Sequence, residues 1–355
     1  MEENRTVSRT RSKRRKLKQK KKKRLTIVGI SFLIIFLGAI TVFGFFYSKL
    51  DQLFAGISET KSSTGQSANA ATLDPSLTPV DRNKDEPFAV AIMGTDGRAG
   101  GGGYNTDVLL VAVVDPNDKG ITMLSIPRDT KAEIPGYSGY RKVNSAYAYG
   151  ELKRASQERN GEMITETGPS LVKKTLSNLL DIPIDFHVQI GFDGFVDVVD
   201  AVDGVRVNVS RSMQYDDPID GTHIRLEPGE QTLDGKNALD YVRHRLDNRG
   251  VSYYSSDFER NERQQEVIRA VIGKLLSIQG MTNLDNVIEA IADNVSTNFT
   301  SEQLMELTRS FVSLRTPQIS SIETDAYWDS SQSYTIIPES NLIEIRQQLK
   351  ELLHK

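Results

Sequence analysis

Residues 88–129 read FAVAIMGTDGRAGGGGYNTDVLLVAVVDPNDKGITMLSIPRD, and this stretch decides the fold. It contains three short apolar runs, at residues 88–93, 108–114 and 121–126, which are separated by segments rich in Gly, Asp and Pro. Near-continuous apolar runs of this length are typical of strands that are buried on both faces. We therefore expect three strands of one buried sheet.

The sequence that follows interleaves strand and helix patterns. Apolar and polar residues alternate in residues 184–190 and 205–209, which predicts two more strands. Helical periodicity occurs around residues 144–158, 170–180, 192–202, 235–245, 257–277, 284–293, 301–313 and 340–353. Strands interleaved with helices predict an α/β (α+β) fold with a central mixed β-sheet flanked by helices.

The N-terminal part of the chain has the features of a membrane anchor. Residues 25–47 are apolar and carry no charge, and 23 residues at about 1.5 Å each can cross a hydrocarbon core of about 30 Å. The 13 Lys or Arg residues of segment 1–24 indicate that this side is cytoplasmic. A cleaved signal peptide is the alternative, but its apolar region usually has only about 7–15 residues. We predict an uncleaved signal anchor of a single-pass cell-membrane protein.

Four parts of the chain follow from these patterns. We expect a basic cytoplasmic head (1–24), a transmembrane signal anchor (25–47), a flexible linker (48–85) and an extracellular domain that includes the C-terminal helices (86–355). The linker is assigned because its residues are mostly small and polar, with Pro among them.

The net charge of −3 combines two opposite contributions. Residues 1–24 carry 13 basic and two acidic residues, a net +11, so the other 331 residues carry −14. The basic head contains no aromatic residue that could stack on a base, and a membrane anchor already explains its charge, so we expect no nucleic-acid partner. The chain has no Cys, which excludes disulfides, thiolate metal sites and a Cys nucleophile.

Two carboxylates flank the connection between the first two expected strands. Asp96 follows the first strand and Asp107 precedes the second, so antiparallel pairing would place both at one edge of the sheet. Neighbouring carboxylates repel unless a cation lies between them, and Mg²⁺ takes one or two carboxylates together with water and phosphate oxygens. One interpretation of the pattern is a site for a divalent cation such as Mg²⁺ at Asp96 and Asp107. Both are also ordinary turn residues, which is the alternative.

A charged stripe begins the helix expected from residue 257. Asp257, Arg260 and Gln264 share one face of that helix. The same face continues with apolar residues, which are Ile268, Val271 and Leu275. Charge on an inward-facing stripe is costly unless it is paired or used. Two interpretations remain open here, a buried ion pair between Asp257 and Arg260 or a polar cavity.

The cavity interpretation brings in two more arginines. The segment LDGKNALDYVRHRLD, residues 233–247, predicts a helix from Gly235 that presents Arg243 and Arg245. Arginine forks suit phosphate oxygens, and several that converge favour a diphosphate over a single carboxylate. Other catalytic centres are not supported, because the four histidines lack metal-ligand spacing and no G-x-S-x-G motif is present.

Seven motifs, in this order, resemble the LytR-CpsA-Psr family of Gram-positive bacteria over roughly residues 86–275. They are MGTDGR, NTDVLLVAVVDP, ITMLSIPRDT, KVNSAYAYG, VDVVDAVDGVRVNV, LDGKNALDYVRHR and DFERNERQQ. The resemblance implies a Mg²⁺-assisted phosphotransferase that moves an anionic glycopolymer, such as teichoic acid or capsule, from a polyprenyl-pyrophosphate carrier to peptidoglycan. It also implies a mixed sheet between helices and a hydrophobic tunnel for the lipid chain.

The resemblance also assigns roles to residues of this chain. Asp96 and Asp107 would be the metal-associated acids. The residues implied in catalysis are Asp107, Arg128, Asp257 and Arg260. Those implied in pyrophosphate binding are Arg98, Arg128, Arg243, Arg245, Arg260 and Gln264. One position departs from the family pattern, because Asn105 stands where the family often has Arg, and Arg98 would then have to compensate.

Two other functions stay open at the level of sequence. A hydrolase would cleave the same polyprenyl-pyrophosphate donor with water in place of a sugar hydroxyl. A non-catalytic cell-surface regulator would bind the lipid and leave it intact. The sequence leaves open which glycopolymer is used, the oligomeric state and the role of residues 278–355, for which packing is the default.

Overall fold

The computed structural model describes residues 80, 85–95, 106–118, 120–218, 221–275, 295–312 and 318–354. All of them belong to the unit formed by residues 52–355. The predicted head, transmembrane anchor and most of the linker lie outside the described residues, as do Asp96, Arg98, Asn105 and the helix expected around 284–293. Among the helices that the structure describes, none is both long enough and apolar enough to span a bilayer.

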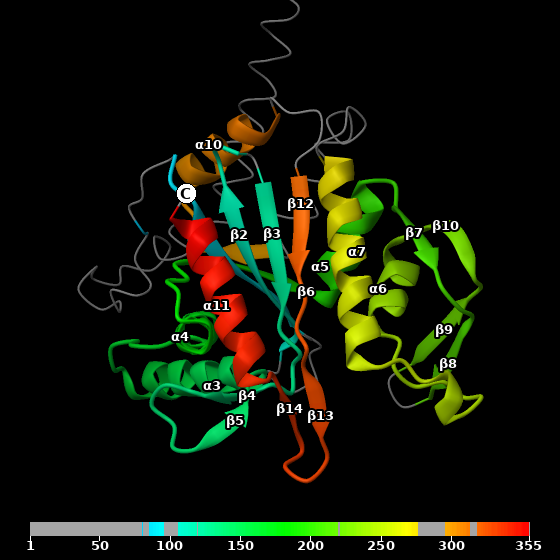
Figure 1. The fold of residues 1–355 in the computed structure, drawn as a ribbon, viewed down its shortest axis with the longest axis horizontal. Coiled ribbons are helices and arrows are strands. Elements are labelled where there is room, and N and C mark those ends of the chain that lie inside the picture. The colour runs from blue at the N-terminus through cyan, green and yellow to red at the C-terminus, as the bar shows by residue number, and fades with distance from the viewer. Residues whose placement is uncertain are drawn as a thin grey trace, which may run out of the picture. The chain divides into compact units, whose positions relative to one another are not determined.

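The centre of the fold is a mixed sheet of six strands (Figure 1). In spatial order these are β11 (Val295–Thr297), β6 (Phe186–Gly191), β1 (Phe88–Thr95), β2 (Thr106–Asp115), β3 (Gly120–Ser125) and β12 (Gln318–Ile322). β1, β2 and β3 pair antiparallel, whereas β6 runs parallel to β1 and β12 parallel to β3. The predicted mixed sheet and its first three strands are confirmed.

Because β1 and β2 are antiparallel, the start of β2 lies at the same edge of the sheet as the end of β1. Gly94 pairs with Val108 and Thr95 with Thr106, with a register shift between the two pairs. A Cβ on Gly94 would lie 2.9 Å from Cβ of Val108, closer than real side chains approach. The glycine therefore permits the close pairing that places Asp107 at this edge.

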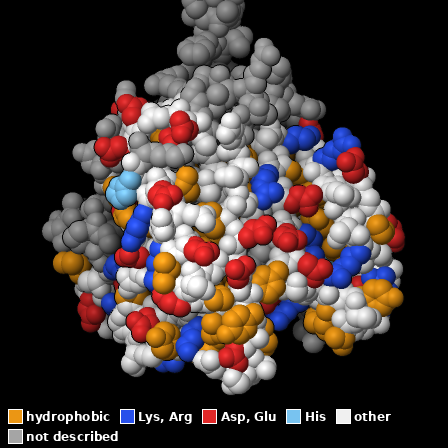
Figure 2. Space-filling view, in the orientation of Figure 1, with side chains coloured by type: hydrophobic (Ala, Val, Ile, Leu, Met, Phe, Trp, Pro, Cys, Tyr) orange, Lys and Arg blue, Asp and Glu red, His pale blue; other side chains and the backbone are white. Residues whose placement is uncertain are grey.

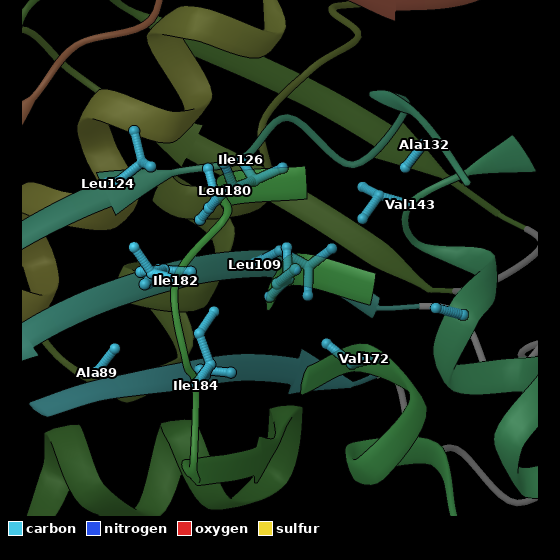
Figure 3. Packing of buried hydrophobic residues seen from close by; sticks show 14 of the residues in the cluster. Ala89, Leu109, Leu124, Ile126, Ala132, Val143, Val172, Leu180, Ile182 and Ile184 are labelled. Carbon is cyan, nitrogen blue, oxygen red and sulfur yellow. The ribbon is translucent and has the colours of Figure 1, made fainter. Parts of the chain in front are cut away.

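One face of the sheet packs against three helices, α3 (Ser145–Asn160), α4 (Gly168–Leu180) and α11 (Glu339–Leu353) (Figure 1). Alternate residues of β1, such as Ala89 and Met93, point into this core. Figure 3 shows Leu109 of β2 within the same cluster as Leu180 and Ile182, which come from the end of α4 and the segment after it. This core supports the side of the sheet that faces away from the candidate site.

The intervening residues of the strands face the other side of the sheet. Phe88 and Phe186 pack there with Phe299, whose ring stacks on that of Phe186 at 4.0 Å between centroids. Helix α10 (Ser301–Val312), which agrees with the helical pattern around residues 301–313, covers this cluster with Leu304 and Leu307.

A second group of elements stands beside the sheet, at the right of Figure 1. It contains helices α5 (Phe192–Ala201), α6 (Gly235–Arg243) and α7 (Asp257–Leu275), with a short 3₁₀ helix at Val251–Tyr253. It also contains two hairpin-like sheets, β7 (Val205–Val209) with β10 (Gly229–Leu233) and β8 (Met213–Asp217) with β9 (Thr222–Leu226). The group has its own hydrophobic cluster, which includes Val205, Tyr241 and Val267.

Two short hairpins lie side by side at the bottom of Figure 1, and neither is expected from the sequence. They are β4 (Lys131–Glu133) with β5 (Tyr140–Lys142), and β13 (Tyr327–Asp329) with β14 (Tyr334–Ile336). A bridge between Thr130 and Thr335 joins them, and the amide of Thr335 donates to the carbonyl of Asp129 at 2.9 Å. The last third of the chain therefore returns to the residues that follow β3.

Candidate active site

A cavity of about 400 Å³ lies between the sheet and helices α5, α6 and α7. Most of its wall is apolar and includes Ile92, Val188, Ile190, Phe195, Val198, Leu239, Val242, Ile268, Val271 and Ile272. Its polar lining includes six residues that the sequence singles out, namely Asp107, Arg128, Arg243, Arg245, Arg260 and Gln264. We call this space the apolar cavity.

A second, more polar space of about 730 Å³ adjoins the first. Three residues line both spaces: Asp107, Arg128 and Arg245. Further residues of the second space include Asp129, Arg141, Lys142, Asn144, Ser145, Tyr149, Trp328, Gln332 and Tyr334. We call it the polar groove. The shared residues mark the place where the two spaces meet.

Asp107 and Arg128 form an ion pair at this junction, with 2.6 Å between Oδ1 and Nη1. Asp107 is at the start of β2 and Arg128 follows β3, and antiparallel pairing of these strands brings both residues to one edge of the sheet. The two side chains are partly exposed, and the second oxygen of Asp107 accepts no hydrogen bond from a described residue. Nε of Arg128 is buried and donates to no described residue.

Arg260, in the first turn of α7, lines the apolar cavity. Only 7% of its side chain is exposed, and its Nη2 lies 2.7 Å from Oδ1 of Asp257. Burial lowers the pKa of Arg260, and Asp257 opposes that effect by favouring the charged form. The charges of Arg128 and Arg245 also act on this guanidinium, which lowers its pKa further. Arginine nevertheless remains charged in such sites.

The buried Nε of Arg260 has no hydrogen-bond acceptor among the described residues. A buried donor without a partner is rare and calls for an explanation. An anionic ligand at the junction would supply the missing acceptor and would neutralise the clustered positive charge of Arg128, Arg245 and Arg260.

The stripe predicted on α7 lines the apolar cavity. Arg260 and Gln264 line it near the N-terminus of the helix, and Ile268 and Val271 continue the lining toward the C-terminus. Asp257 lines neither space and contacts Arg260 instead. The ion pair and the cavity, which are alternatives at the level of sequence, therefore occur together.

The two arginines at the end of α6 differ in their surroundings. Arg243, the last residue of the helix, lies over the ring of Phe192 at 4.9 Å from the centroid. Arg245 comes two residues after the helix, is exposed and forms no ion pair within the described part of the chain. It is thus available to a ligand in either space.

Arg263 binds the backbone at the end of α6 and is not among the site residues predicted from the sequence. Its Nε donates to the carbonyl of Tyr241 at 2.8 Å and its Nη2 to the carbonyl of His244 at 2.6 Å. Burial lowers the pKa of Arg263 to about 10. Its position within the DFERNERQQ motif is the sequence signal that could have identified it. Arg263 fixes the backbone from which Arg243 and Arg245 extend.

A buried Ser-His-Asp arrangement lies next to this backbone. Nδ1 of His244 is 2.9 Å from Oγ of Ser255, and its Nε2 is 3.4 Å from Oδ2 of Asp247. Burial and the nearby Arg263 lower the pKa of His244 to about 4. Asp247 binds Arg249, whose side-chain hydrogen bonds lower the pKa of Asp247. Because the side chains of His244 and Asp247 are fully buried, the arrangement is structural.

The predicted metal site is only partly visible. Asp107 is at the junction, whereas Asp96 and the predicted pyrophosphate ligand Arg98 lie outside the described residues. Within the described part of the chain, no three His, Asp or Glu residues are grouped as a metal site. Asp107 alone still suits Mg²⁺, because this ion takes few protein carboxylates and completes its shell with water and substrate phosphate.

Comparisons with known proteins agree with this geometry. The family described as "LytR_cpsA_psr family" matches residues 46–351. The chain is 30% identical over 340 residues to the "Polyisoprenyl-teichoic acid--peptidoglycan teichoic acid transferase TagU" of Bacillus licheniformis, with 95% of this chain and 99% of that protein aligned.

Solved structures share the fold. The crystal structure of Bacillus subtilis TagV has a TM-score of 0.59 and 29% identity, and the match covers 77% of this chain and 99% of that one. A structure described as "TagT bound to LI-WTA" has a TM-score of 0.57 and 27% identity, and the match covers 78% and 94% of the two chains.

Proposed function

This chain belongs to the LytR-CpsA-Psr family, and on that premise we propose that it transfers an anionic glycopolymer of the teichoic acid or capsule type from a polyprenyl-pyrophosphate carrier to peptidoglycan. The relative from B. licheniformis is named for such a transfer of teichoic acid. The observation that carries the proposal is the junction of an apolar cavity with an arginine cluster, at residues that also line a polar groove.

Each part of the donor has a matching part of the site. A polyprenyl chain is purely apolar and fits the apolar cavity, where it would bury surface at about 25 cal/mol per Å². The pyrophosphate would lie at the junction, where Arg128, Arg245 and Arg260 provide planar donors. The glycan portion would extend away from the apolar wall.

Phosphoryl transfer requires mainly positioning and stabilisation of charge. A hydroxyl oxygen of the acceptor forms a bond to the phosphorus that carries the glycopolymer, and the bond from that phosphorus to the polyprenyl-phosphate oxygen breaks. The arginines stabilise the negative charge that grows on the departing polyprenyl phosphate. The hydroxyl proton passes to Asp107 or Asp129, the carboxylates that line the groove.

Asp257 has a positioning role in this scheme. It lines neither space, and its carboxylate contacts Arg260. It therefore fixes the guanidinium of Arg260 and keeps it charged, rather than acting on the acceptor hydroxyl.

Mg²⁺ would be held by Asp107 together with Asp96 and would supply further charge neutralisation of the pyrophosphate when bound. Asp107 suits this role because one of its carboxylate oxygens accepts no hydrogen bond from a described residue. The anchor predicted at residues 25–47 would keep the domain at the outer face of the membrane, where its lipid donor is exposed.

The test uses the full chain in detergent micelles with a polyprenyl-pyrophosphate-linked glycopolymer, Mg²⁺ and peptidoglycan. We expect release of polyprenyl phosphate together with a covalent polymer–peptidoglycan product, and loss of both with EDTA. Release that is equally fast without peptidoglycan would identify a hydrolase, the second candidate, which the exposure of Asp107 and Arg245 to water favours. An intact lipid after long incubation would indicate a non-catalytic lipid-binding regulator.

A further inference from the structure

One wall of the polar groove is formed by the β13–β14 hairpin. The hydroxyl of Tyr334 donates to the carbonyl of Tyr140 at 3.1 Å, and Nζ of Lys131 donates to Oε1 of Gln332 at 2.7 Å. In the turn, the carboxylate of Asp329 accepts hydrogen bonds from the residues that follow it. Two side-chain hydrogen bonds thus join this hairpin to the β4–β5 hairpin.

An aromatic ring stands on this wall with much of its surface open to water. Trp328 is the only tryptophan of the chain, lines the groove and is 48% exposed. Figure 2 shows hydrophobic side chains gathered at the lower edge of this face, over the same hairpin. Nζ of Lys142 lies 5.3 Å from the centroid of the indole ring and 3.2 Å from Oδ1 of Asp129, so a paired cation lies beside the ring.

An exposed, oriented indole in a polar groove suits a sugar ring. The face of an aromatic ring is electron-rich and attracts the C–H groups of a pyranose, while the sugar hydroxyls turn to polar neighbours such as Asn144. A purely apolar ligand would displace water from such a neighbour without replacing its hydrogen bonds.

The groove also offers two arginines that have no anionic partner in the described structure. Arg141 and Arg245 are exposed, line the groove and form no ion pair with a described residue. Because Arg245 is already assigned to the pyrophosphate, Arg141 is the arginine that suits a carboxylate of the occupant of the groove. Peptidoglycan has this chemistry, because its amino-sugar chain bears lactyl-peptide branches that end in carboxylates.

The in-line geometry of phosphoryl transfer indicates that the acceptor and the lipid part of the donor lie on opposite sides of the junction. The attacking and leaving oxygens of a phosphoryl transfer are roughly in line. If the polyprenyl phosphate leaves toward the apolar cavity, the attacking hydroxyl must arrive from the opposite side of the junction. The polar groove shares Asp107, Arg128 and Arg245 with the apolar cavity and thus provides that approach.

We therefore propose that the polar groove binds the acceptor, a strand of amino sugars with carboxylate-bearing peptides, and that Trp328 stacks on one of its sugar rings. The inference rests on the proposed function and adds to it the place and the chemistry of acceptor recognition.

The single tryptophan allows a binding experiment that needs no turnover. Tryptophan emission of the full chain in micelles is titrated with short, uncrosslinked peptidoglycan strands. We expect a saturable change in emission, and none with a free glycerol-phosphate polymer at the same ionic strength. A change caused by the polymer alone would assign the groove to the donor and overturn the proposal.

Transfer kinetics provide the second readout. We expect Trp328→Ala to raise the KM for the acceptor about tenfold, which corresponds to about 1.4 kcal/mol, with little change in kcat or in the KM for the donor. Trp328→Phe should restore most of the acceptor affinity. Tyr327→Ala is the matched control, because Tyr327 is the neighbouring strand residue, is 52% exposed and does not line the groove.

The outcomes separate this inference from the function on which it rests. Unchanged emission with peptidoglycan, together with an equal acceptor KM in the Trp328→Ala and Tyr327→Ala proteins, would overturn the groove assignment and leave the transferase intact. Saturable binding of peptidoglycan without any transfer product would overturn the proposed function and leave the groove assignment standing.

Discussion

Oδ1 of Asp107 lies 2.6 Å from Nη1 of Arg128, and this pair lines both the apolar cavity and the polar groove. Partly exposed ion pairs of this kind contribute only about 0–1 kcal/mol to stability. The pair can therefore open at little cost when a pyrophosphate arrives, which would leave Arg128 able to bind the phosphate oxygens and Asp107 able to hold Mg²⁺.

Substitution of either partner should thus impair catalysis far more than folding. We expect Asp107→Asn and Arg128→Met to lower the rate of polyprenyl-phosphate release at least about 100-fold, because loss of one charge-stabilising group typically costs about 2.7–4 kcal/mol in the transition state. The shift in urea unfolding free energy should stay within about 1 kcal/mol. Release is measured with the lipid-linked donor and peptidoglycan.

Arg206→Ala is the matched control for this pair. Arg206 is an exposed arginine of β7 that pairs with Glu230, and it lines neither space. The Arg206→Ala protein should release polyprenyl phosphate at the same rate as the unaltered chain. Full activity in the Arg128→Met protein would contradict the assignment of the pyrophosphate to the junction.

The sheet and the charged stripe of α7 are predictable from sequence because each has a strong local signal. The apolar runs of β1, β2 and β3 need no distant information, and the spacing of Arg260 and Gln264 on α7 follows from helix geometry. The antiparallel β1–β2 pair is confirmed, and Arg260 and Gln264 line a cavity that is mostly apolar. The roles assigned to these residues in catalysis stay predictions.

The polar groove is not predictable in the same way. Its wall joins Lys142 to Trp328, which are separated by more than half of the described domain in sequence, and β4, β5, β13 and β14 have only three residues each. Such short strands have no measurable periodicity. Arg263 is missed for another reason, since its partners are the carbonyls of Tyr241 and His244, so that only its place in the DFERNERQQ motif marks it in the sequence.

Binding of a long-chain donor should weaken when a larger side chain occupies part of the apolar cavity. We expect Ile268→Trp, which adds bulk to the cavity wall on α7, to raise the KM for a long-chain donor about tenfold, equivalent to about 1.4 kcal/mol of lost binding. Binding of a short-chain, water-soluble pyrophosphate analogue should change little, because the arginines are unaltered. The two KM or Kd values are compared in the same preparation.

Ile343→Trp provides the control for added bulk, since Ile343 is exposed on α11 and lies outside the apolar cavity. An equal loss for long-chain and short-chain ligands in the Ile268→Trp protein would argue that the lipid binds elsewhere.

Arg263 should matter for stability as well as for the site. Removal of its guanidinium in Arg263→Met leaves the carbonyls of Tyr241 and His244 without their donors, and each unsatisfied buried group costs about 1–3 kcal/mol. We expect the unfolding free energy to fall by about 2–4 kcal/mol and the KM for the donor to rise, because Arg243 and Arg245 lose their support. Arg269→Met, a change at a more exposed position of the same helix, should cost less than about 1 kcal/mol.

The buried His244 should make the stability of the domain depend on pH. Its pKa in the folded chain is about 4, below its ordinary value of 6.5, so between these pH values the unfolded chain binds a proton that the folded chain does not. Stability is therefore retained above pH 6.5 and lost as the pH falls toward 4, by up to about 3 kcal/mol from this residue. The depressed pKa of Asp247 adds a further loss only at more acidic pH, below about 4.

The measurement is the urea unfolding free energy of the chain at several pH values between 7 and 4, a window set by the two pKa values of His244. His244→Gln removes the titrating group, so the decline over this range should be shallower than in the unaltered chain. His354→Gln, at an exposed histidine near the C-terminus, should leave the slope unchanged. Parallel profiles for the unaltered chain and the His244→Gln protein would show that His244 titrates normally, and the buried arrangement with Ser255 and Asp247 would then have to open in solution.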